Sequence, residues 1–326
     1  MLDTGLTRRF GLTVPVVSAP MAGASGGALA ASVSGAGGLG VLGVGNSTPP
    51  DWITRNGATA AASGRPFGVG LLAWSRPDST GQLDAVLALD PAPALVSVSY
   101  GEPIGDERRY LDPLRTAGCV VATQVGNLDD VRRARDDGFD VLVVRGGEGG
   151  GHGRNSVATL PLLQDALELL GDLAQPPLVL AAGGISTARG VAAVLAAGAA
   201  GAWVGTAFLA CPESTIADAA KGRLLAADNS GTVYTAAFDR GFRLGWPDAY
   251  AGRALRNRFT DTWTGREDQL ADATEAQAEL ATARITRDYD VDHVYAGQSV
   301  GSVRRVRPAA EVVADLARAE DLLSRW

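Results

Sequence analysis

Short apolar runs alternate with Ala-, Leu- and Arg-rich helical stretches over the first 211 residues of the chain. Most runs are continuous in Val, Leu and Ala, which is typical of parallel strands that are covered on both faces. Eight runs in 211 residues give roughly 26 residues per strand–helix unit, a comfortable length for a closed α/β barrel of the (β/α)8 type. The predicted strands are Val16–Met21, Leu39–Gly43, Phe67–Ala73, Ala94–Tyr100, Cys119–Val125, Phe139–Arg145, Leu178–Ala182 and Ala202–Leu209.

The stretches between these runs carry helix boundary signals. Asn127 is a candidate N-cap for a helix over Leu128–Asp137, and Ser186 precedes a second helix over Thr187–Ala197. A glycine follows each stretch and can end the helix. A doubly wound open sheet would accept the same alternation, but the count of eight strands favours closure into a TIM barrel.

The pattern changes at residue 212, where a polar, helix-like and aromatic-rich segment begins and runs to residue 296. Two interpretations of its aromatic side chains stay open. They form the core of a helical subdomain, or they cap the barrel mouth and give a substrate pocket its apolar walls. These side chains are Tyr234, Phe238, Phe242, Trp246, Tyr250, Phe259 and Trp263.

The last segment, 297–326, contains a predicted helix that Pro308 opens and that runs to Trp326. Its apolar stripe should pack back on the barrel. We therefore divide the chain into a barrel over 1–211, a helical subdomain or cap over 212–296 and a C-terminal segment with its helix.

Composition excludes several classes of protein. The net charge of −7 argues against a nucleic-acid binder. Lys221 is the single lysine and lies in no Schiff-base or Walker motif. Cys119 and Cys211 are isolated, so neither a disulfide framework nor a zinc site is expected, and a cytoplasmic location fits best. We expect neither a signal peptide nor a membrane-spanning segment.

Three of the predicted strands end in loops suited to ligand chemistry. The stretch 181–186 places Gly183 and Gly184 between the seventh strand and a helix, where a backbone can approach an anion closely. The eighth strand carries Gly205 and Thr206, and loops after strands seven and eight often hold phosphate in barrels. The alternative is that these glycines only make tight turns. A literal Gly-x-Gly-x-x-Gly over 35–40 closes a helix instead of opening one, and we discard it.

The sixth strand is followed by a glycine-rich loop over 145–154 that contains His152. A loop with so little backbone restraint needs something to order it, and close approach to a planar ring is one reason. His152 could remove a carbon-bound proton or steady an anion. His293 has no such context and is expected to be structural or exposed.

Two further strand ends contribute candidate contacts on the same rim. Met21 follows Pro20 at the end of the first strand, and Gln124 at the end of the fifth can offer a donor and an acceptor to a heterocycle. Either residue alone is a weak indication of a ligand site, but both are expected at the same end of the barrel, which strengthens the prediction.

Taken together, these motifs resemble the nitronate monooxygenase family, formerly called 2-nitropropane dioxygenases. The resemblance covers most of the chain, and its most specific part is Glu148-Gly-Gly-Gly-His152. It implies an FMN-dependent TIM barrel that oxidises alkyl nitronates with O2, with His152 as the catalytic residue. It also implies FMN contacts at Ala19, Pro20, Met21, Gly70, Gln124, Arg145, Gly147, Gly150, Gly151, Gly183, Gly184, Gly205, Thr206 and Gln298.

The chain departs from the family pattern at three positions. Gly70 stands where many relatives carry Asn, Arg145 where many carry Gln, and Gly149 where many carry Ala. Arg145 could place a cation beside the flavin or the substrate anion. We expect these changes to affect the choice of substrate more than the choice of cofactor.

The alternatives are an NAD(P)H-dependent flavin reductase of the enoyl-acyl-carrier-protein or quinone reductase type, a colourless phosphosugar isomerase, and a non-catalytic flavin- or phosphate-binding module. The expected partners are a nitronate or nitroalkane and O2, without nucleic acid or membrane, and a homodimer fits.

Overall fold

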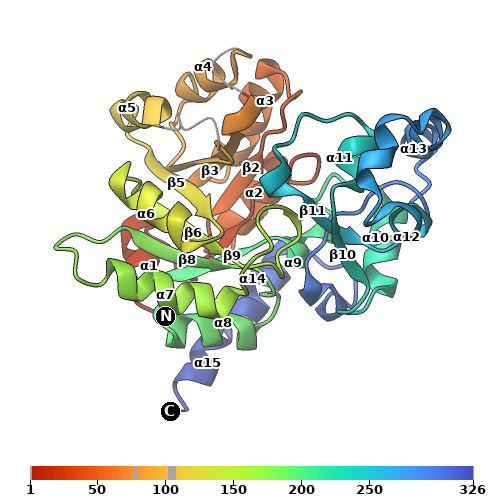
Figure 1. Cartoon of the computed structure of the whole chain (residues 1–326). Coiled ribbons are helices and arrows are strands. Elements are labelled where there is room, and N and C mark those ends of the chain that lie inside the picture. The colour runs from red at the N-terminus through yellow and green to blue at the C-terminus, as the bar shows by residue number, and fades with distance from the viewer. Residues whose placement is uncertain (1, 76–79, 102–107, 326) are drawn as a thin grey trace.

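A computed structural model describes residues 2–75, 80–101 and 108–325. Eight parallel strands form one sheet in the order β1-β9-β8-β6-β5-β4-β3-β2 (Figure 1). The sheet closes between β1 and β2, where the Ser18 N–H donates to the Leu39 carbonyl at 2.9 Å. The predicted (β/α)8 barrel is therefore confirmed. Its strands are β1 (Val16–Ser18), β2 (Gly40–Gly43), β3 (Phe67–Leu72), β4 (Leu95–Ser99), β5 (Val120–Val125), β6 (Val141–Arg145), β8 (Leu178–Ala182) and β9 (Gly201–Val204).

Helices surround the barrel and bury its outer face. The Asn127 side chain accepts from the Asp130 N–H and caps α6, as predicted, whereas the cap of α8 is Thr187 and not Ser186. The helices of this layer are α2 (Gly27–Gly35), α3 (Pro50–Ala61), α4 (Gln82–Leu87), α5 (Arg108–Thr116), α6 (Leu128–Asp136), α7 (Thr159–Leu170) and α8 (Ala188–Ala196), and a 3-10 turn, η1 (Ala73–Ser75), follows β3.

An apolar plug fills the amino-terminal end of the barrel. Leu6 and Phe10 of α1 (Gly5–Phe10) pack with the inward side chains of the strands, among them Val17, Leu95 and Trp203. This end is therefore a packed core, and chemistry is left to the opposite end.

Two strands end three or more residues before the predicted position. The first ends at Ser18 and not at Met21, because Pro20 follows and has no N–H for the ladder. The predicted strand over 202–209 ends at Val204, and Thr206–Leu209 forms the short helix α9. Pro20, Met21 and Gly205 therefore lie in loops, and Thr206 begins a helix, so all four lie outside the sheet.

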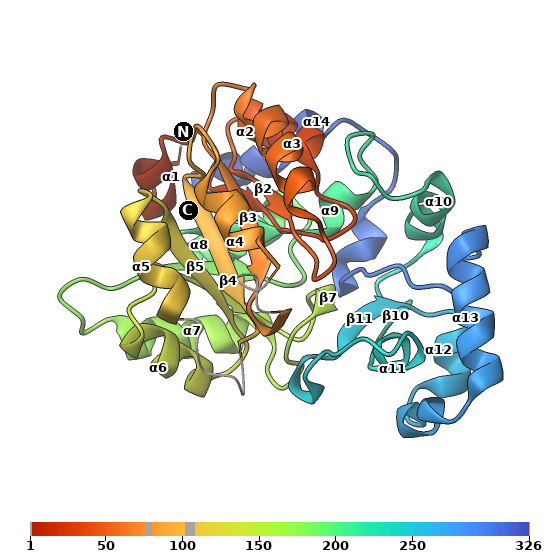
Figure 2. The ribbon, with the colours of Figure 1, turned by 90° about the horizontal axis from the view of Figure 1, so that it is seen from above.

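The segment over 212–296 is not purely helical, which corrects our expectation. It contains an antiparallel pair of strands, and β11 also pairs with the two-residue strand β7 (Gly151–His152) of the glycine loop. Figure 2 shows β7 between the barrel and this segment. Its elements are α10 (Asp218–Ala226), β10 (Thr232–Thr235), α11 (Ala237–Gly241), η2 (Asp248–Tyr250), β11 (Gly252–Leu255), α12 (Arg258–Trp263), η3 (Glu267–Ala271) and α13 (Thr274–Thr286).

The C-terminal segment packs back on the barrel, as predicted. After η4 (Gln298–Ser302), Pro308 caps α14 (Ala309–Ala317), which contacts α2, α8 and α9. The helix breaks at Arg318, and α15 (Ala319–Leu323) follows along α8. Trp326, the predicted helix end, lies outside the described residues.

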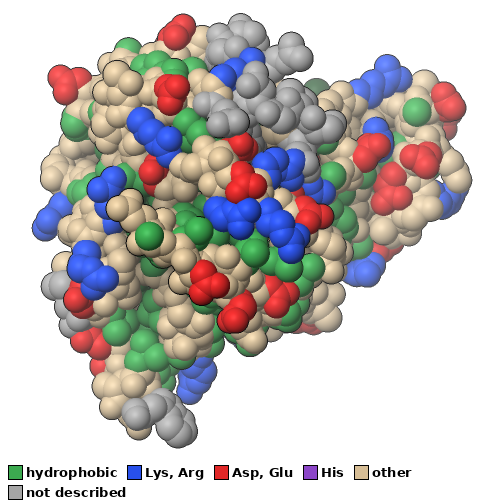
Figure 3. All heavy atoms as spheres, turned by 60° about the vertical axis from the view of Figure 1, so that its left-hand side comes forward, with side chains coloured by type: hydrophobic (Ala, Val, Ile, Leu, Met, Phe, Trp, Pro, Cys, Tyr) green, Lys and Arg blue, Asp and Glu red, His purple; other side chains and the backbone are tan. Residues whose placement is uncertain are grey.

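Acidic and basic side chains alternate over short distances on the face drawn in Figure 3, so no broad region of one sign forms there. Among the described helices, none combines the length and the apolar character that crossing a bilayer requires.

Candidate active site

Arg145 organises the glycine loop at the carboxyl end of β6. Its side chain is buried, and its guanidinium donates to the carbonyls of Gly149 at 2.5 Å, Gly151 at 3.0 Å and Arg154 at 3.0 Å. The expectation that Arg145 places a cation beside a flavin or a substrate anion stays a prediction; the structure shows that its guanidinium donates to carbonyls of its own loop. Burial lowers the pKa of Arg145 from its ordinary value, yet a guanidinium stays charged.

Gly149 fits this arrangement. A Cβ at Gly149 would lie 2.7 Å from Nε of Arg145, too close for an unmoved side chain. Two departures from the family pattern, Arg145 and Gly149, are therefore two sides of one contact.

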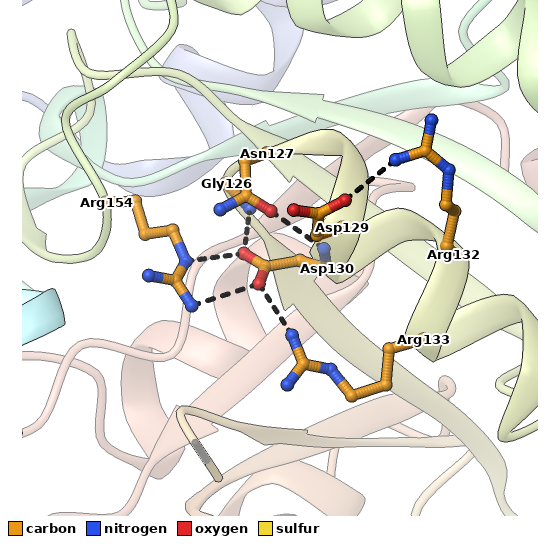
Figure 4. Close-up of polar contacts among 7 residues, drawn as sticks. All are labelled: Gly126, Asn127, Asp129, Asp130, Arg132, Arg133 and Arg154. Atoms are coloured by element: carbon orange, nitrogen blue, oxygen red, sulfur yellow. Dashed lines mark hydrogen bonds and ion pairs between the residues drawn. The ribbon is translucent and has the colours of Figure 1, made fainter. Parts of the chain in front are cut away.

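Two more arginines fix the ends of the loop. Arg154 donates to both carboxylate oxygens of Asp130, at 2.8 and 3.1 Å, and Asp130 also accepts from Arg133 and from the Gly126 N–H (Figure 4). Arg253 of β11 donates to the carbonyl of Gly147 at 2.7 Å. Guanidinium groups thus order the loop from within the chain.

The loop after β8 lies against the glycine loop. Gly183 and Gly184 have φ angles of +105° and +71°, which side chains rarely adopt. A Cβ at Gly183 would lie 3.1 Å from the Gly149 nitrogen. The Thr159 hydroxyl donates to the Glu148 carboxylate at 2.9 Å, and its oxygen lies 3.2 Å from the Gly183 carbonyl. Within the described residues, the N–H groups of Gly183 and Gly184 have no hydrogen-bond acceptor.

The loop after β9 completes this side of the mouth. A Cβ at Gly205 would lie 3.4 Å from Cβ of Ala19 and 3.5 Å from Sδ of Met21. Thr206 accepts from the Gly297 N–H at 3.0 Å. Gln298, which follows Gly297 and has an exposed side chain, donates its backbone N–H to the Glu148 carbonyl at 2.9 Å. A Cβ at Gly150 would clash with the Gly297 nitrogen. These contacts link the loops after β6, β8 and β9 at one end of the barrel.

The remaining candidate positions continue around the same end of the barrel. A Cβ at Gly70 would lie 2.3 Å from Cβ of Pro20, so the proline ring fills the space that a side chain would need. Gln124 lies near the end of β5, where its side chain lowers the pKa of Tyr100 against the larger effect of burial, and the Tyr100 hydroxyl donates to the His152 carbonyl at 3.3 Å. The rim thus continues from Pro20 to His152.

The 212–296 segment holds His152. Its Nε2 lies 2.8 Å from Oδ1 of Asp239 on α11, and its ring stacks on Trp246 at 3.7 Å with 4° between the planes. A carboxylate only accepts, so Nε2 carries the proton and the neutral ring has its lone pair on Nδ1. Nδ1 has no hydrogen-bond partner among the described residues. Burial lowers the pKa of His152, and the hydrogen bond and charge of Asp239 oppose that shift.

The aromatic side chains divide into two groups by what they contact, and their role as walls of a substrate pocket stays a prediction. Phe238 and Phe259 belong to the segment's own core. Trp246 and Tyr250 instead contact barrel residues, since the ring of Tyr100 lies 5.2 Å from the first and 5.3 Å from the second. The segment is therefore both a small core and a cap over His152.

The sequence pattern did not identify Asp239 and Arg253 as site residues. Neither lies in a recognisable motif, and each reaches the site through a β10–β11 hairpin that the helix-like pattern concealed. A polar residue inside an aromatic stripe, as Asp239 is, was the one available signal. His293 pairs with Asp292 at 2.8 Å, in agreement with a structural role.

The mouth suits the phosphate end of a cofactor. Its glycines present backbone without side chains, and two unpaired N–H groups are available to an anion. A closed parallel barrel with these loops and a histidine at its mouth defines an oxidoreductase of the flavin-dependent TIM-barrel class.

The comparisons identify the family. The nitronate monooxygenase family model matches residues 4–82 and 78–319. A nitronate monooxygenase from Paraburkholderia phytofirmans is 31% identical, over 95% of this chain and 93% of the relative. The chain belongs to the nitronate monooxygenase family, whose members are flavoproteins.

Other relatives carry other names. The "(3aS,4S,5R,7aS)-5-hydroxy-7a-methyl-1-oxo-octahydro-1H-indene-4-carboxyl-CoA dehydrogenase" of Mycobacterium tuberculosis is 35% identical over 73% of this chain, and the match spans 64% of that relative. Among solved structures, FabK from Thermotoga maritima has a TM-score of 0.83 at 26% identity and covers 100% of this chain and 98% of its own. A nitroalkane oxidase from Streptomyces ansochromogenes has a TM-score of 0.77 at 29% identity, with 98% and 99% covered.

Proposed function

We propose that this enzyme is an FMN-dependent nitronate monooxygenase that oxidises alkyl nitronates, and nitroalkanes that it first deprotonates, with O2. The observation that carries the proposal is the His152–Asp239 pair, 2.8 Å apart, beside the glycine loops. The relatives named nitronate monooxygenase and nitroalkane oxidase support the same reaction.

His152 is the base for a neutral nitroalkane. Its lowered pKa keeps the imidazole neutral at physiological pH, with the lone pair on Nδ1. The proton leaves the carbon next to the nitro group and goes to Nδ1. Asp239 fixes the tautomer before this transfer and stabilises the imidazolium after it. The buried, stacked position between Asp239 and Trp246 also limits water around the ring.

FMN would be held by residues at the strand ends. Gly183, Gly184, Gly205 and Thr206 would bind the phosphate, while Pro20, Met21 and Gln124 would flank the ring. When bound, the flavin supplies the electron acceptor for the oxidation. Arg145 would act from behind, because it holds the loop carbonyls and so positions His152.

The test is the visible spectrum of the purified protein, followed by anaerobic addition of propyl-2-nitronate or NADPH. Flavin bands that bleach with the nitronate and not with NADPH are expected. A colourless protein, or one that only NADPH bleaches, contradicts the proposal.

A flavin-dependent dehydrogenase or reductase is the second candidate, because the carboxyl-CoA dehydrogenase relative is the more identical one over the matched part. It predicts that NADPH bleaches the flavin or that the enzyme turns over an acyl thioester.

We also propose a homodimer and, since Cys119 and Cys211 are free and buried, a cytoplasmic location.

A further inference from the structure

A second cavity lies outside the barrel mouth. It has a volume of about 470 Å³ and lies between the start of α8, the helix α9 and the C-terminal segment. Figure 1 shows α14 and α15 beside α8, where this segment packs on the barrel. None of the glycines assigned to the cofactor lines it, so it is distinct from the candidate active site.

Its lining is strongly basic. Six arginines line the cavity against two aspartates, an excess of four positive charges in a chain whose net charge is −7. Burial and Glu213 raise the pKa of the Cys211 thiol, which also lines the cavity, to about 12, so this group adds no negative charge. The arginines are Arg189, Arg304, Arg305, Arg307, Arg318 and Arg325.

Among the described residues, four of these six arginines have no carboxylate partner. Arg307 pairs with Asp315, and Arg305 lies 3.7 Å from Glu311. The other four have no carboxylate within 4.0 Å among the described residues. Like charges gathered without counter-charges destabilise one another, which a bound anion would relieve.

We propose that this cavity binds a small ligand through a pyrophosphate group, either free pyrophosphate or that of a nucleotide. Guanidinium groups bind phosphate oxygens through paired, charge-assisted hydrogen bonds, and several of them suit an anion with more than one phosphate. The volume is in the range of small-molecule sites, and Val303 and Leu322 add apolar lining.

The test is calorimetric titration of the flavin-loaded protein with sodium pyrophosphate and with ADP at constant ionic strength. The double variant Arg304→Gln/Arg318→Gln should weaken pyrophosphate binding at least about tenfold, because each lost charged contact is worth about that factor. Arg132→Gln, which removes an exposed arginine on α6, is the matched control and should bind like the wild type. Tighter binding of ADP than of pyrophosphate identifies a nucleotide, and equal binding identifies free pyrophosphate.

Absence of binding at about 10 mM pyrophosphate, or equal affinity in the double variant and the wild type, overturns the proposal. The glycine loops carry none of these arginines, so loss of binding in the double variant assigns the anion to this cavity. The result is independent of whether the protein oxidises nitronates.

Discussion

The barrel and the 212–296 segment contribute different parts of the same site. The barrel supplies backbone: glycines at strand ends, held by arginines and by the Glu148–Thr159 hydrogen bond. The segment supplies side chains, since Asp239 hydrogen-bonds His152 and Trp246 stacks on it. Binding of the cofactor and control of His152 should therefore be separable. Variants on the barrel side should lose flavin or stability, and variants in the segment should lose activity.

The largest effect is expected from the residue where the two regions meet. His152→Ala should lower kcat/KM for a neutral nitroalkane by about 10²- to 10⁴-fold, the usual contribution of a general base, and should leave the flavin bound. Activity on a preformed nitronate should fall less. His293→Ala is the matched control and should stay within a few-fold of the wild type. Equal losses on both substrates would show that His152 binds the anion and is not a base.

A second variant tests how the barrel side is ordered. Arg145→Gln should lower the free energy of unfolding by about 2–3 kcal/mol, because it leaves buried loop carbonyls without their charged donor. Chemical denaturation measures this loss.

The Arg145–Gly149 contact predicts coupling between these two positions. Gly149→Ala should destabilise the wild type by about 1–3 kcal/mol through overpacking and should cost less in the Arg145→Gln background, where the contacts with Nε and Cζ are removed. Additive effects in the double-mutant cycle would mean that the two residues do not constrain each other.

A smaller effect is expected at the phosphate loop. Gly184→Ala puts a side chain at a φ of +71° and a methyl group in the mouth, so FMN should dissociate several-fold more readily, as ultrafiltration of the holoenzyme would measure. Gly118→Ala has the same kind of strain, with φ +84° and nothing within 4 Å, but lies after α5. If both variants lose flavin equally, general destabilisation is the cause and the loop does not contact the phosphate.

The barrel could be predicted from the sequence because its signals are local. Most buried strands are continuous apolar runs, and the Asn127 cap lies at the start of its helix. The strand ends also showed where glycines and His152 would gather. The predicted strand over 202–209 was too long because Ala, Phe and Leu of α9 are as apolar as a strand, and periodicity cannot separate the two over so few residues.

The second region could not be predicted in the same way, because its contacts are long-range. Arg253 lies 106 positions from the Gly147 carbonyl that it binds, and Asp239 lies 87 positions from His152. No local spacing encodes such pairs. Arg145 was assigned to the ligand from its position at the end of a strand, and no local signal showed that its donors also reach back to its own loop.

In the mechanism that we propose, Asp239 sets the tautomer and the pKa of His152 from outside the barrel. The direct measurement is the pH dependence of kcat/KM for a neutral nitroalkane in Asp239→Asn. Asp239 raises the pKa of His152 against the effect of burial, so its removal should move the acidic limb to lower pH, slow turnover through loss of the fixed tautomer and leave flavin content unchanged. An acidic limb that stays in place, or loss of the flavin with the carboxylate, would contradict it.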